Sequence, residues 1–152
     1  MNEHTERLQR LEQALQEQVN AWRLHPVVAA RQALRGGQCT VAVTMVAAMG
    51  DLPRFDTPRE LMPFLGLIPS AYASGAQRRQ GAITKAGNTH ARTVLVAGAW
   101  AYRYPAKVSR HLQLRLDKQP KLLQDLSWKA QGRRCTRYPR LVARGTHANV
   151  VT

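Results

Sequence analysis

The sequence predicts an all-α fold, a small helical domain preceded by an extended N-terminal helix. Apolar residues recur at helical spacing, prolines and capping residues stand where such segments begin or end, and no segment shows a convincing strand pattern. The chain has 152 residues, 44% of them hydrophobic, which suits one domain with at most a small appendage.

The first predicted element is a polar helix over residues 3–24. Leu8, Leu11 and Leu15 fall at alternating spacings of three and four, which gives a narrow apolar seam. We therefore assign residues 1–24 to a coiled-coil-like arm. Its seam either pairs with a helix of another chain or packs back on the domain, and the sequence leaves both alternatives open.

Helices are expected next over residues 26–34 and 40–49, and Gly36 and Gly37 lie in the turn between them. Gly50 ends the second helix. Two helices joined by a glycine turn have the outline of a helix-hairpin-helix element, in which turn amides approach a phosphate. A plain helical hairpin fits the same pattern.

A short helix over residues 58–65 follows, because Thr57 and Glu60 have the pattern of a capping box. Pro63 lies inside this helix and is expected to strain or kink it. Residues 66–87 then form a long basic loop. A loop of about 20 residues inside a compact domain is usually functional or disordered.

Three further helices complete the predicted fold. Asn88 suits the N-cap of the first, a strong helix that Pro105 ends. These helices cover residues 88–103, 106–117 and 122–134. The remaining residues are expected to be basic, irregular and loose.

The chain carries a formal net charge of +14, and the excess is confined to its second half. Residues 61–116 hold eight basic residues and no acidic residue, and residues 126–152 hold six basic residues and no acidic residue. Protein surfaces usually mix both signs, so a long one-sign stretch implies an acidic partner, most commonly a phosphate backbone. A self-solvating basic tail is the alternative, and it fits residues 133–144 better than residues 61–116.

Several functional classes find little support. The nine acidic residues do not cluster as a two-metal nuclease needs, and the five histidines lack ligand spacing, so we predict no metal or cofactor site in this chain. Cys39 and Cys135 form no paired-ligand motif and suit a reducing compartment. No apolar run is long enough to span a membrane and no signal peptide is recognisable, so we expect a cytoplasmic protein.

Ser74 is the candidate for chemistry. It precedes Gly75, whose missing side chain lets backbone amides approach a ligand, and Arg78 and Arg79 follow. Paired arginines hold a phosphate bidentately and stabilise its charge in a transition state. From spacing alone, Ser74 is a nucleophile, a phosphate contact or a turn residue. The predicted nucleic-acid-binding residues are Gly36, Gly37, Gly75, Arg78, Arg79, Lys85, Asn88, Arg92, Arg103, Lys107 and Arg110.

A set of short motifs follows in order along about residues 25–145. The motifs are LRGGQ (residues 34–38), MGDLPRFD (49–56), LMPFLGLIPS (61–70), SG (74–75), RRQG (78–81), ITKAGN (83–88) and HAR (90–92). Each motif alone is unspecific, but the ordered set is specific. Together they resemble the C-terminal domain of insertion-sequence transposases of the IS110, IS116 and IS902 type.

The resemblance implies a domain organisation and a chemistry. In that family an N-terminal RuvC-like domain carries an acidic metal site, a coiled-coil arm follows, and the next domain bears a serine that attacks DNA. By motif position Ser74 matches this serine, and Ser70 is the less favoured candidate. Some members use a structured guide RNA. Mg²⁺ is expected only with the RuvC-like domain.

The resemblance covers no RuvC-like domain, so we expect a fragment, truncated at both ends, with little activity alone. Residues 1–24 are then the arm, residues 25–145 the DNA-binding domain and residues 146–152 a truncated tail. We predict DNA binding, with serine-dependent strand cleavage and rejoining when the chain is joined to the metal domain. The alternatives are a non-catalytic nucleic-acid-binding module, and an interaction fragment that pairs with another copy or with an intact transposase through the arm.

Overall fold

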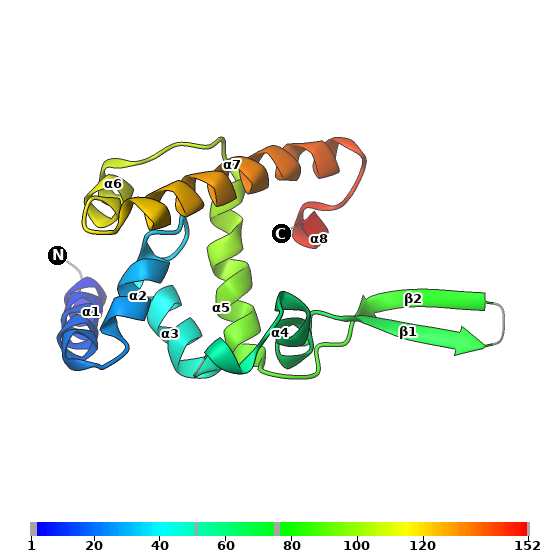
Figure 1. Cartoon of the computed structure of the whole chain (residues 1–152), viewed down its shortest axis with the longest axis horizontal. Helices are drawn as coiled ribbons and strands as arrows, with labels where there is room; N and C mark the ends of the chain where they lie inside the picture. The colour runs from blue at the N-terminus through cyan, green and yellow to red at the C-terminus, as the bar shows by residue number, and fades with distance from the viewer. Residues whose placement is uncertain (1–2, 51, 75–76, 152) are drawn as a thin grey trace.

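The computed structural model describes residues 3–50, 52–74 and 77–151. Its helices are α1 (Glu3–Ala21), α2 (His25–Gln32), α3 (Cys39–Met49), α4 (Pro58–Phe64), α5 (Thr89–Ala99), α6 (Arg110–Leu116), α7 (Lys121–Ala143) and α8 (Ala148–Val151), with the 3₁₀ helices η1 (Leu52–Arg54) and η2 (Trp100–Arg103). Two strands, β1 (Pro69–Ser74) and β2 (Gln77–Ile83), complete the structure. Helices dominate, so the predicted all-α fold is confirmed (Figure 1).

The centre of the molecule is formed by α2, α3 and α5. α3 is apolar on nearly every side, and it contacts both of the other helices. Met45 and Met49 are buried together with side chains of α5, whereas Val46 is buried with Val19 of α1 and Val28 of α2. Each fully buried aliphatic side chain stabilises the fold by about 1.5–3 kcal/mol. The two clusters therefore fix both the α1–α2 pair and α5 to α3.

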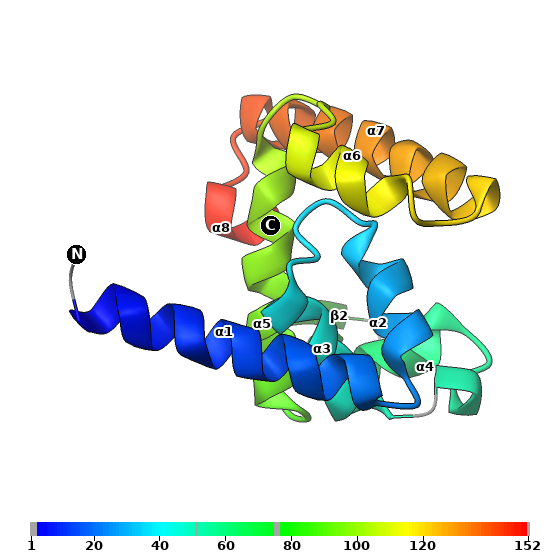
Figure 2. The ribbon, with the colours of Figure 1, turned by 90° about the vertical axis from the view of Figure 1, so that its left-hand side faces the viewer.

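α1 packs on the domain through its second half. Val19 is buried and Leu15 packs beside it, but Leu8 and Leu11 are 57% and 63% exposed. Figure 2 shows the first turns of α1 extending beyond the rest of the molecule. The domain thus covers the C-terminal end of the predicted apolar seam, at Leu15, and leaves Leu8 and Leu11 exposed to solvent.

α5 and η2 follow each other without a break and fill the range predicted for one helix, residues 88–103. The Asn88 side chain accepts a hydrogen bond from the Ala91 amide at 2.9 Å, so the predicted N-cap is confirmed. The predicted capping box of α4 does not form, because Glu60 reaches the amide of Asp56 and not that of the N-cap residue Thr57. Glu60 accepts a hydrogen bond from the Asp56 amide at 3.0 Å, but Thr57 makes no side-chain capping bond.

The segment predicted to be a basic loop is instead a β-hairpin. β1 and β2 pair antiparallel, with Tyr72 opposite Arg79 and an irregularity between Pro69 and Ala71. The hairpin projects away from the helices (Figure 1). Because it stands free of the core, its strands do not need the apolar–polar alternation of a half-buried sheet, and the sequence carries no strand signal.

Backbone hydrogen bonds join the segment that leads from the hairpin into α5 to the end of α4. The Lys85 amide donates to the Gly66 carbonyl at 3.1 Å, and the Asn88 amide donates to the Phe64 carbonyl at 2.9 Å. Gly87 permits this approach, because a β-carbon there would lie 2.5 Å from the Phe64 oxygen. These contacts fix where the hairpin leaves the helical body.

α6 begins later than predicted because Ser109 caps it. The Ser109 hydroxyl accepts a hydrogen bond from the Leu112 amide at 3.3 Å. The chain between Pro105 and Ser109 therefore runs without a helix. Leu112 and Leu116 are buried in one cluster with Ala33, which attaches α6 to the end of α2.

The prediction of a loose C-terminal end is wrong, because α7 is 23 residues long and continues past residue 134. Ser127, Gln131 and Cys135 recur every four residues and are buried. The Ser127 hydroxyl donates to the Ala33 carbonyl at 2.6 Å. The buried stripe is largely polar, so a pattern of apolar residues does not reveal it.

Candidate nucleic-acid interface

The structure places the candidate serine at the free end of the hairpin. Ser74 is the last residue of β1, and the next two residue pairs along the ladder include Arg78 and Arg79. The backbone therefore brings both arginines within two pairs of Ser74. Gly75, and the side chains of residues 72–80, lie outside the described part of the structure.

Three other predicted residues, Lys85, Asn88 and Arg92, gather where the hairpin meets α5. Asn88 caps the helix, and Arg92 donates to the Leu65 carbonyl at 2.9 Å and to the Thr89 hydroxyl at 3.2 Å. Lys85 is exposed and has a φ of 56°, in the left-handed region. Of these three side chains, the Lys85 ammonium is the one without a hydrogen-bond partner among the described residues.

The remaining predicted cations lie at the other end of α5. The Arg103 guanidinium carbon is 5.3 Å from the ring centre of Trp100 and 4.7 Å from that of Tyr104. Lys107 and Arg110 follow and are exposed. α5 and η2 together span about 22 Å at 1.5 Å per residue. The structure thus divides the predicted surface into two separate groups.

Gly36 and Gly37 face the interior of the molecule. A β-carbon at Gly36 would lie 2.1 Å from the Gly98 oxygen of α5. The buried Gly37 donates from its amide to the Leu34 carbonyl at 2.9 Å, and its own carbonyl accepts from Arg115 at 3.0 Å. Burial also lowers the pKa of the Arg115 guanidinium. The α2–α3 element is a packed helical hairpin, and the helix-hairpin-helix interpretation is not confirmed.

Sequence reasoning misses the arginines of α7. Arg137, Arg140 and Arg144 are expected above to belong to a loose end, and Arg133 to the last turn of the predicted helix. All four lie along one exposed side of α7 and its C-terminal end. Their spacings of four, three and four follow the period of a helix, and this period is the signal that identifies the surface.

The part of the chain that the structure describes contains no group of three His, Cys, Asp or Glu side chains able to hold a metal ion. Within the same ranges, no helix is both long and apolar enough to cross a membrane.

The sequence is similar to known transposases. The putative transposase y4qE of Sinorhizobium fredii is 42% identical over 141 residues, which cover 93% of this chain and 36% of the relative. The transposase for insertion sequence element IS1111A of Coxiella burnetii is 33% identical over 87 residues, which cover 57% of this chain and 22% of the relative. The chain therefore spans little more than a third of the first relative and less of the second.

A family match covers the hairpin and α5. Residues 32–113 match the family described as Transposase IS116/IS110/IS902. This match covers more than half of the 152 residues. The chain therefore belongs to the IS116/IS110/IS902 family of transposases.

Proposed function

We propose that this chain contacts DNA during transposition, chiefly through the β1–β2 hairpin. The observation that carries this proposal is the hairpin itself, which projects from the helical body (Figure 1) within the acid-free span of residues 61–116. A projecting element with unopposed positive charge suits a phosphate backbone. The transposase family of the chain supports DNA as the partner.

In this proposal Ser74 is the nucleophile. Its hydroxyl attacks a backbone phosphorus, and the new bond from the serine oxygen to phosphorus replaces the bond to one end of the cut strand. The hydroxyl proton passes to the oxygen of the released strand end. One phosphoester replaces another, so rejoining needs no further energy source. A serine is a weak nucleophile unaided, and the rest of the transposase supplies its activation.

Ser70, the other candidate in the hairpin, is engaged internally. Its hydroxyl donates to the Ala82 carbonyl at 3.0 Å, beside the irregular part of the ladder. A serine hydroxyl has one proton to donate, and this hydrogen bond uses it. The geometry supports Ser74 ahead of Ser70.

The strand register separates the roles of the two arginines. Alternate positions of a strand belong to opposite faces of a sheet, and opposed positions share a face. Tyr72 is opposite Arg79, and position 74 lies two residues from position 72, so positions 74 and 79 share one face and position 78 the other. We infer that Arg79 binds the phosphate that Ser74 attacks, and that Arg78 binds the neighbouring backbone.

Replacing Arg78 and Arg79 together by glutamine is expected to weaken binding to a DNA duplex by roughly ten- to a hundredfold, because two charged phosphate contacts are lost. The slope of log affinity against log salt should also fall by about two. Anisotropy titrations of a labelled duplex at several salt concentrations measure both quantities. The control variant Arg7→Gln, Arg10→Gln removes the same charge from exposed positions of α1. Equal losses for the two variants would contradict a binding site in the hairpin.

The exposed apolar residues of α1 favour a second candidate function. We propose that α1 pairs with another copy of the chain or with an intact transposase, because Leu8 and Leu11 are left uncovered by the domain. The double variant Leu8→Ser, Leu11→Ser is expected to be monomeric in sedimentation velocity, while a control at the exposed Gln9 and Gln16 keeps the wild-type association state. A wild-type chain that stays monomeric with and without a longer relative would exclude this function.

A further inference from the structure

The outer side of α7 carries a row of arginines that the hairpin proposal does not use. Arg133, Arg137, Arg140 and Arg144 are all exposed, and their spacing places them along one side of the helix and its end. At 1.5 Å per residue the row is about 17 Å long. We call these four residues the arginine row.

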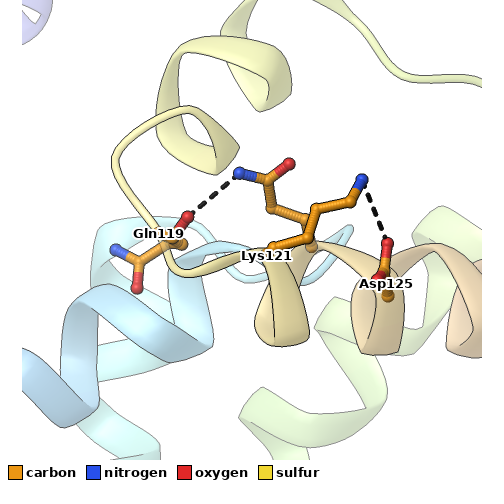
Figure 3. Close-up of polar contacts among 4 residues, drawn as sticks. Gln119, Lys121 and Asp125 are labelled. Carbon is orange, nitrogen blue, oxygen red and sulfur yellow. Dashed lines mark hydrogen bonds and ion pairs between the residues drawn. The ribbon is translucent and has the colours of Figure 1, made fainter.

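The charges of the arginine row are not neutralised within the described structure. None of its guanidinium groups has a hydrogen-bond or ion-pair partner among the described residues. Figure 3 shows the salt bridge of α7, which joins Lys121 to Asp125 at 3.2 Å near the start of the helix. Asp125 is the last acidic residue of the sequence. Like charges three and four residues apart on a helix repel each other, so the row weakens the helix unless an anion lies across it.

The helix dipole does not account for the arginine row. Cations stabilise the last turn of a helix, which explains Arg140 and Arg144. Arg133 lies more than two turns before the end of α7, where this effect has decayed. The N-terminal part of the row therefore needs another explanation.

The arginine row borders an open hollow of about 590 Å³. Gly132 belongs to the lining, in mid-helix, and a β-carbon there would meet no atom within 4 Å. Glycine weakens a helix interior relative to alanine, and no packing contact in the described structure requires it at this position. A glycine here keeps the helix backbone open to close approach by a ligand.

The buried side of α7 lies opposite the start of the arginine row, and Cys135 is its last buried residue. Gln131 and Cys135 are buried, and the Ser127 hydroxyl bonds to the Ala33 carbonyl at the end of α2. Cations fixed on a docked helix lose less conformational freedom on binding than cations on a mobile tail. The start of the row, at Arg133, is therefore fixed on a docked part of the helix.

We propose that the arginine row binds the phosphate backbone of a nucleic-acid duplex, as a second contact separate from the hairpin. An arginine binds a phosphate with two parallel hydrogen bonds, and a row of about 17 Å is long enough to contact several phosphates of a duplex backbone. A single strand calls for aromatic side chains on which bases stack, and a protein partner for an aromatic-rich centre. The lining of this hollow contains no aromatic residue among the described side chains. Tyr102 and Tyr138 line a different hollow, which only Arg133 and Arg137 of the row border.

The test compares two quadruple glutamine variants of the 152-residue chain. One replaces the arginine row. The control replaces four exposed arginines on and near α1 and α4, namely Arg7, Arg10, Arg23 and Arg59. Each protein is titrated with a labelled DNA duplex and a labelled RNA duplex over a range of salt concentrations. We expect the row variant to lower the salt slope by about three to four and the control by less than about one.

A variant that leaves the charge of the chain unchanged separates weaker binding from loss of folding. Gly132→Leu places a side chain in the hollow and raises helix propensity, so we expect severalfold weaker binding with an unchanged or raised melting temperature. Melting followed by circular dichroism provides the stability of every variant.

The outcomes separate the arginine row from the hairpin. If the row variant and Gly132→Leu both bind like the control, the row is not a nucleic-acid site. A row variant that loses only self-association would assign the row to an acidic protein surface and overturn the proposal. If the row variant binds only the DNA duplex or only the RNA duplex more weakly, the result supports the backbone contact and identifies which nucleic acid the row binds. If only the Arg78→Gln, Arg79→Gln variant binds nucleic acid more weakly, the hairpin is the contact and this proposal is overturned. If only the row variant binds more weakly, the row is the contact and the hairpin contact is overturned.

Discussion

Replacing Gly36 by alanine is expected to lower the free energy of unfolding by about 3–5 kcal/mol, a large part of the stability of a small domain. Gly36 has a φ of 81°, which is costly for any residue with a β-carbon. The added carbon would also lie 2.1 Å from the Gly98 oxygen. That oxygen belongs to the backbone of α5, so it has no alternative rotamer. The α2–α3 turn must move away from α5, which exposes part of the core.

Gly145 provides a matched control for the Gly36 variant. Its φ is 83°, nearly the same, but a β-carbon there would meet no atom within 4 Å. Gly145→Ala is therefore expected to cost only the backbone strain, about 1–2 kcal/mol. Urea unfolding followed by circular dichroism measures both variants. Equal losses at the two glycines would show that the contact between the turn and α5 contributes nothing to stability.

The helices that the sequence predicts well have start and stop signals within one turn of their ends. Asn88 caps α5 with its own side chain, and Gly50 follows α3 with a φ of 60°. Such signals act between residues close in sequence, so they are readable without knowledge of the tertiary structure. The beginnings of α2 and α4, each with a proline in the first turn, belong to the same class.

The hairpin and the second half of α7 depend instead on contacts between residues far apart in sequence. Arg35 donates to the Pro105 carbonyl at 2.7 Å and lies 3.7 Å from the Cys135 sulfur. These contacts and the buried polar stripe stabilise α7, and the spacing of apolar residues in the sequence does not predict its second half. The base of the hairpin is fixed by backbone hydrogen bonds, which leave no record in the side-chain pattern.

The candidate site also includes some residues that the sequence identifies and others that only the structure places. The order of contiguous motifs singles out Ser74 and its neighbours, because those residues are close in the sequence itself. That Gly36 and Gly37 face inward follows from packing alone. The separation of Arg103 from the base of the hairpin follows instead from the length of α5 and η2, about 22 Å, which the predicted helix over residues 88–103 already implies. The arginine row is a different case. Its helical spacing is visible in the sequence, and only the wrong expectation of a loose end conceals it.

Replacing Ser74 by alanine is expected to abolish the covalent link between protein and DNA. The measurement uses a chimaera in which this chain replaces the matching 141-residue segment of the putative transposase y4qE, so that the hydroxyl is tested in a full-length relative. Labelled DNA that remains attached to protein in a denaturing gel reports the link. Only the Ser74 oxygen forms that bond in our proposal, so no other residue replaces it.

DNA binding by the same Ser74→Ala chimaera should fall no more than about fivefold, because one hydroxyl contributes about 1 kcal/mol to a phosphate contact. Ser70→Ala is the matched control within the same strand. Its hydroxyl is bonded to the Ala82 carbonyl, so its loss loosens the irregular part of the ladder but leaves the link in place. A link that survives Ser74→Ala and disappears in Ser70→Ala would transfer the nucleophile to Ser70. A fall in binding as large as the fall in linkage would reduce Ser74 to a phosphate contact, because a nucleophile acts on the reaction and hardly on the affinity.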